Sequence, residues 1–144
     1  MNWKTEAMEK LKKYDAMRKS VENIPEELRR LELAATGIRS AGAEEAPVRG
    51  GNRWDDTLLS IMTQKQELQW ALEQAQLWVR TTNRALGTLS TEEKLILHRL
   101  YMYPEKGSLA RLCSDLGMEQ SSVYRKRDRA LHKFTLAFYG TADS

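Results

Sequence analysis

Apolar residues in the first part of the chain recur at alternating steps of three and four positions. The series runs through Tyr14, Met17, Val21, Ile24, Leu28, Leu31, Ala35 and Ile38, and Trp3, Ala7 and Leu11 extend it towards the N-terminus. This spacing places the residues on one side of an α-helix and suits a seam between two helices. Pro25 interrupts the series, because proline lacks an amide hydrogen and crowds the preceding turn. We therefore expect two consecutive helices, or one kinked helix, over about residues 3–39.

A second helical pattern covers residues 54–86. Its main apolar stripe consists of Leu58, Ile61, Leu68, Leu72, Ala75, Val79 and Leu86, and a second row on another face contains Leu59, Met62, Trp70 and Leu77. The intervening residues 40–53 are rich in glycine, contain Pro47 and lack periodicity, which predicts a connecting loop with a mobile tip at Gly50–Gly51. We expect a long antiparallel helical hairpin over residues 1–86. The second row then needs cover, either from the C-terminal module or from another subunit.

Shorter helical segments follow residue 86. Ser90 and Glu93 have the spacing of a capping box, which predicts a helix start. Residues 104–107 form a turn signal, after which Ser108 is expected to cap a short helix.

The last helix is predicted over about residues 120–139. Gly117 precedes it and is expected to end the short helix in a left-handed conformation. Apolar residues expected to face inward are Val123, Ala130, Leu131, Phe134 and Phe138. The fold class is thus all-α, with the hairpin followed by a compact module over residues 87–144.

Composition narrows the function classes. A chain of 144 residues fits one domain or two small helical modules that share a core. No apolar stretch approaches the ~20 residues of a membrane span, and the N-terminus lacks the apolar core of a signal peptide, so a cytoplasmic protein is expected. Cys113 is the only cysteine, and the two histidines are far apart, so we expect no disulfide, metal or cofactor. No nucleophile–base pattern favours an enzyme.

Charge is unevenly distributed. Residues 1–46 carry nine basic and nine acidic side chains, whereas residues 120–134 carry five basic side chains and one acidic one. A basic helix after a neutral segment is typical of nucleic-acid binding, although a solvated helix face would have the same composition.

The C-terminal third resembles region four of bacterial sigma factors, the region that reads the −35 promoter element. The resemblance rests on Leu89-Ser90 with Glu93, Leu97 and Tyr101, Leu112-Cys113, Leu116-Gly117-Met118, Val123-Tyr124-Arg125 and Arg129-Ala130-Leu131. With the preceding helices, the whole chain is similar to small phage and prophage proteins that include the ArpU-type late regulators. The spacing of residues around Gly117 itself predicts a helix-turn-helix, with Cys113 buried where its helices cross and with Arg125 and Arg129 exposed.

Two sets of residues are candidates for DNA contact. The candidates for base contact on the outer face of the last helix are Gln120, Ser121, Tyr124, Arg125 and Asp128. The candidates for phosphate contact are Lys126, Arg129 and Lys133, with Ser108, Arg111 and Ser122 as weaker ones.

The expected function is sequence-specific regulation of transcription on double-stranded DNA. The hairpin would form a homodimer or contact bacterial RNA polymerase. Two alternatives remain open, namely a phage DNA-packaging adaptor similar to a small terminase subunit, and a protein-interaction module that no longer binds DNA. The adaptor usually carries its DNA-binding module first, which is the reverse of the order here.

Overall fold

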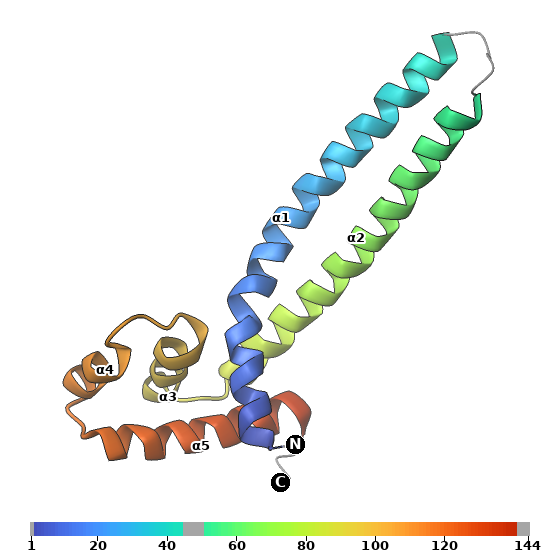
Figure 1. The fold of residues 1–144 in the computed structure, drawn as a ribbon. Coiled ribbons are helices and arrows are strands. Elements are labelled where there is room, and N and C mark those ends of the chain that lie inside the picture. Colours follow the sequence, from blue (N-terminus) through green and yellow to red (C-terminus); the bar gives the residue numbers. More distant parts are fainter. Residues whose placement is uncertain (1, 45–50, 141–144) are drawn as a thin grey trace. The chain divides into compact units, whose positions relative to one another are not determined.

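The computed structural model describes residues 2–44 and 51–140 and is all-helical, without strands, over these residues (Figure 1). The elements are α1 (Trp3–Glu44), α2 (Gly51–Leu86), α3 (Thr91–Leu97), the π-helical turn η1 (His98–Met102), α4 (Ser108–Leu116) and α5 (Gln120–Tyr139). They form two compact units. Unit 1 comprises Met1–Arg18 and Leu77–Ser144, and unit 2 comprises Lys19–Gln76.

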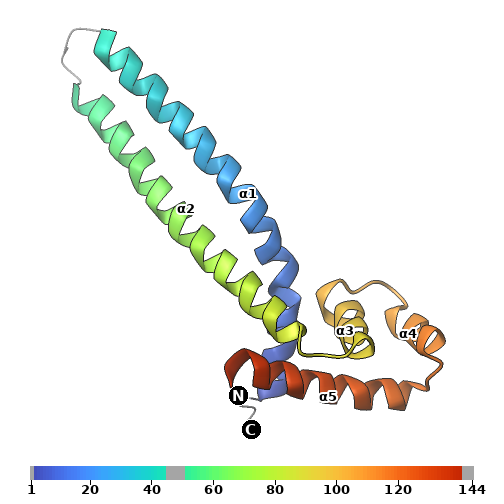
Figure 2. The ribbon, with the colours of Figure 1, turned by 180° about the vertical axis from the view of Figure 1, so that it is seen from behind.

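Unit 2 consists of the part of α1 from Lys19 onward and the part of α2 up to Gln76. These two helical segments lie side by side and run in opposite directions (Figures 1 and 2). Ala35 of α1 and Ile61 and Ala75 of α2 are buried. The ammonium group of Lys65 on α2 forms an ion pair with the carboxylate of Glu32 on α1. The residues of the predicted apolar stripes in unit 2 are buried or half-buried, as expected for a helix side that packs against a neighbour.

The expected bounds of the loop between these helices need correction. Residues 40–44 and 51–53, expected in the loop, are helical, so Gly51 begins α2 while Gly50 lies outside the described residues. The extension of α1 contains two alanines and one glutamate, which favour helix, beside Ser40 and Gly42. Of the two alternatives expected for the first segment, the structure has the single helix, with Pro25 inside α1. The Pro25 side chain is exposed to solvent. Proline has no amide hydrogen to donate to the carbonyl group four residues earlier, and at an exposed position water can donate to that carbonyl instead.

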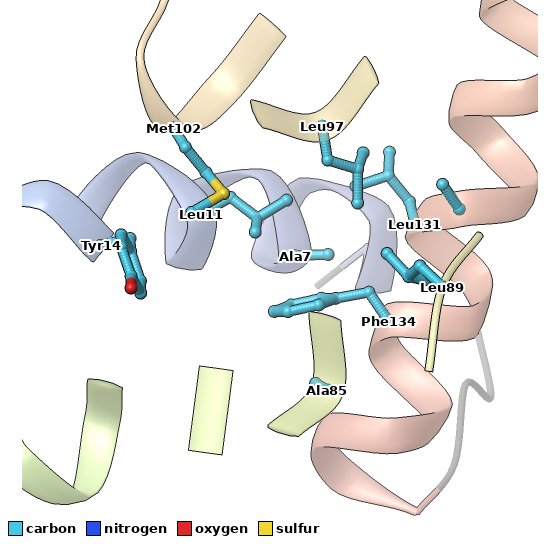
Figure 3. Packing of buried hydrophobic residues seen from close by; sticks show 10 residues of the cluster. Ala7, Leu11, Tyr14, Ala85, Leu89, Leu97, Met102, Leu131 and Phe134 are labelled. Carbon is cyan, nitrogen blue, oxygen red and sulfur yellow. The ribbon is translucent and has the colours of Figure 1, made fainter. Parts of the chain in front are cut away.

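The core of unit 1 joins residues that are far apart in the sequence (Figure 3). Ala7 and Leu11 of α1 are fully buried together with Leu97, Leu131 and Phe134 from the C-terminal helices. The first part of α1 thus packs against α5 as well as α2. This packing crosses the sequence-based boundary at residue 86.

A hydrogen bond also links α1 to α2 beside this core. The hydroxyl group of Tyr14 donates to Oδ1 of Asn83 at 2.8 Å. Ala85 and Leu89 complete the cluster where α2 ends. Unit 1 therefore includes the first part of α1 and the last part of α2.

A smaller cluster holds α3, α4 and α5 together. Ile96, Leu112 and Val123, one from each helix, are fully buried against one another. Cys113, predicted to be buried, is only half-buried. Leu112 takes the central position on α4, and the shorter cysteine side chain packs at the edge of the cluster.

The two predicted caps have different outcomes. The capping box of α3 is confirmed, because Glu93 N donates to Ser90 Oγ at 3.2 Å and Ser90 N donates to Glu93 Oε1 at 2.9 Å. The prediction that Ser108 caps α4 is wrong, since the N-cap residue is Gly107. The Ser108 hydroxyl instead donates to the carbonyl oxygen of Glu105 and accepts from its amide.

Candidate nucleic-acid interface

The corner between α4 and α5 is made by Gly117. Its backbone is left-handed, with φ 62° and ψ 37°, as predicted. Met118 N donates to the carbonyl oxygen of Cys113 at 3.0 Å, which satisfies one of the last carbonyl groups of α4. After Glu119, in extended conformation, α5 begins at Gln120. The turn between α4 and α5 is therefore short, and one side of α5 is exposed to solvent.

Arg125 and Arg129 lie on this open side of α5. Both are exposed, as predicted, and residues four positions apart share one face of a helix. Arg125 Nη2 donates to Ser122 Oγ at 3.1 Å. No ion pair links either guanidinium to a carboxylate within the described residues. These two charges are thus available to an external anion.

The lysines of α5 are engaged differently. Lys126 forms an ion pair with Glu92, and Lys133 Nζ lies 3.1 Å from Glu93 Oε1. Both carboxylates belong to the first turn of α3. Acidic side chains are favourable there, because the N-terminus of a helix carries a partial positive charge. To bind phosphate, either lysine must exchange its partner. The sequence did not reveal this difference among the basic residues.

Glu93 is the most buried of these carboxylates. Burial acts to raise its pKa, but hydrogen bonds from the Ser90 amide and from Lys133 outweigh burial. The net effect is a pKa below the ordinary value of 4.5. The carboxylate is therefore a stable partner for Lys133 near neutral pH.

A cluster of contacts also restrains the middle of the predicted contact face. The Arg127 guanidinium lies 4.5 Å from the centroid of the Tyr124 ring, and its Nη2 lies 2.9 Å from Asp128 Oδ1. Burial acts to lower the pKa of Arg127, but the bonds to Asp128 and Tyr101 raise it. Lys4 Nζ lies 3.3 Å from the same oxygen of Asp128. Asp128 is thus engaged by two cations.

The remaining candidates fall into two places. Gln120 and Ser121 are exposed at the start of α5, and Gln120 Nε2 donates to the Tyr124 hydroxyl at 3.3 Å. Ser108 and Arg111 lie on α4, where both contact Glu105. Three further phosphate candidates, Ser122, Lys126 and Arg129, line a hollow of about 350 Å³ together with Met118 and Arg125, whereas Lys133 lines a different hollow.

Three residues near this surface carried no sequence signal of a position beside α5. Trp3, Lys4 and His132 line a second hollow beside α5. The pattern assigned Trp3 to a helical stripe, and a contact between the chain's first turn and α5 has no local signature.

The charge difference between the units is larger than the segment counts indicated. Unit 1 carries sixteen basic and ten acidic side chains, a net charge of +6, whereas unit 2 carries seven and ten, a net charge of −3. A positive unit attracts polyanions, and an acidic unit does not.

No group of three metal-ligating side chains lies close enough to hold an ion among the residues described. Nor does any helix in this part of the chain have the length and apolar character needed to cross a membrane. Comparisons with protein-family models, with curated proteins and with solved structures find no match to this chain.

Proposed function

We propose that this chain is a sequence-specific DNA-binding regulator of transcription, encoded by a phage or prophage and acting at promoters. The observation that carries the proposal is the pair Arg125 and Arg129 on the open side of α5. They follow a two-helix corner and have no acidic partner among the described residues.

The roles of the two arginines differ by position. Arg125 lies in the second turn of α5, where a recognition helix meets base edges, and its fork of donors matches guanine O6 and N7. Arg129 lies one turn further along and suits a phosphate group. Gln120 and Ser121 begin the helix and have the donors and acceptors for neighbouring bases.

The architecture we propose has two parts, a long helical hairpin and a helix-turn-helix module. In the hairpin, Leu59, Met62 and Trp70 are exposed on unit 2. Such a row of large apolar side chains suits a protein partner, and a second copy of the chain or RNA polymerase would have this role.

The sites at which the chain binds DNA, if it binds any, distinguish the proposal from its alternatives. A packaging adaptor would bind near a packaging start, and a pure interaction module would not bind DNA. Genome-wide mapping of bound DNA in the host that carries the gene separates the three, because a regulator's sites lie upstream of an operon.

The direct test uses the full chain and duplexes taken from the mapped sites. Arg125→Ala is expected to weaken specific binding by about 1–3 kcal/mol and to relax the preference at one base pair. Arg30→Ala is the matched control, since Arg30 is an exposed arginine in unit 2. Equal binding by wild type, Arg125→Ala and Arg129→Ala on every duplex would show that this face is merely solvated.

A further inference from the structure

A second hollow of about 380 Å³ lies beside α5, lined by Trp3, Lys4, Asp128, Arg129, His132 and Lys133. This hollow is the α1–α5 notch. It forms because the first turn of α1 contacts α5. The Trp3 ring stands edge-on to the His132 ring at a centroid distance of 5.5 Å, and Lys4 pairs with Asp128.

The position of this turn is set by the core of unit 1. Ala7 and Leu11 are fully buried one and two turns after it. The residues of α1 and of α5 that contact each other at the notch both belong to unit 1. The notch is therefore part of the packed structure rather than a chance approach of a chain end.

Cations outnumber carboxylates in the notch. Lys4, Arg129 and Lys133 line it with Asp128 as the single acidic group. Arg127 also holds Asp128, at 2.9 Å, so this carboxylate keeps a partner when Lys4 leaves. The Lys4–Asp128 pair is partly exposed, and pairs of that kind contribute little to stability. Lys4 can thus turn to an external anion at small cost.

The notch continues the surface that faces DNA in the proposed function. Arg129 lines both the notch and the hollow around Arg125 and Lys126. The two hollows therefore adjoin along α5. A nucleic-acid backbone bound at the first hollow passes next to the second.

We propose that the α1–α5 notch binds a phosphodiester group of the DNA backbone, with Lys4 and Arg129 as its cationic ligands. This inference rests on the proposed function and extends it, since it adds the first turn of α1 to the interface. Phosphate contacts release counterions and carry no sequence information, so the notch strengthens binding to all sequences alike.

The test is a salt titration of binding to a random-sequence duplex by the full chain. Lys4→Ala is expected to weaken binding several-fold at low salt and to reduce the slope of log K against log salt by about 0.9, the value for one lost phosphate contact. Lys12→Ala is the matched control, because Lys12 is an exposed lysine on the same helix that pairs with Glu9 and does not line the notch. It should leave the slope unchanged.

A second variant tests the exchange of partners. Asp128→Asn removes the carboxylate that holds Lys4 and Arg127 and should tighten binding to the random duplex, and it should do so by less when Lys4 is also replaced by alanine. Equal slopes for Lys4→Ala and Lys12→Ala would overturn the proposal that the notch binds phosphate. Unchanged binding by Asp128→Asn would also overturn it. If Arg125→Ala still impaired specific binding, the proposed function would survive that result. A wild-type chain that bound no duplex would overturn both.

Discussion

At the scale of single residues, Gly117 sets the angle between α4 and α5. Its φ of 62° is in the left-handed region, and an added Cβ would meet nothing within 4 Å. A substitution is therefore opposed by backbone strain alone. Gly117→Val should destabilise the chain by on the order of 1–2 kcal/mol, and Gly117→Asn by less, because asparagine tolerates this conformation. Urea unfolding measures both, and equal costs would contradict the conformational reason.

Glu93 is the residue whose effect depends on pH. Its folded pKa lies below the ordinary value, so its ionised form stabilises the fold above the unfolded pKa, and this contribution is lost as pH falls through the folded pKa. Glu93→Gln should therefore be less stable than wild type at pH 7, and the difference should vanish in acid. Urea unfolding of both proteins across pH 7 to about 3 checks this. A difference that persisted unchanged into acid would exclude the carboxylate as its source.

At the scale of elements, the first turns of α1 are a structural part of unit 1. Leu11 is fully buried, whereas Leu33 on the same helix is 67% exposed. Leu11→Ala should cost about 2–5 kcal/mol, the range for truncating a buried leucine. Leu33→Ala should change stability by less than about 0.5 kcal/mol. Unfolding monitored by circular dichroism distinguishes them, and similar costs would contradict the packing of α1.

The elements also show which signals are local enough to be predicted. The limits of α5, the capping box at Ser90 and the turn at Gly117 depend on residues within a few positions, and the structure confirms them. The contact of Leu11 with α5 joins residues more than a hundred positions apart, and no periodicity specifies such a pairing. The same holds in the candidate site for the pairing of Lys126 with Glu92. A basic residue's sequence neighbours do not tell whether the fold neutralises it.

At the scale of the whole molecule, the unit that carries the candidate interface is discontinuous in sequence. The core of unit 1 takes Ala7 and Leu11 from the start of the chain and Ala85 from the end of α2. Residues 87–144 alone would expose the apolar surface that these residues cover. This fragment should therefore lose cooperative unfolding and bind DNA weakly, although it contains every contact residue that the sequence analysis names.

A redesigned chain provides the complementary prediction. A short glycine-serine linker that joins residues 1–18 to residues 77–144 keeps all of unit 1 and omits unit 2. The ends to be joined belong to neighbouring helices, since Tyr14 bonds to Asn83. The chain should unfold cooperatively and bind a random duplex at least as tightly as the full chain, because the omitted unit carries a net charge of −3. Thermal unfolding and salt titration test this design beside the fragment 87–144. If the fragment matched the linked chain in both measurements, the first turns of α1 would be dispensable, and the account of unit 1 would fail.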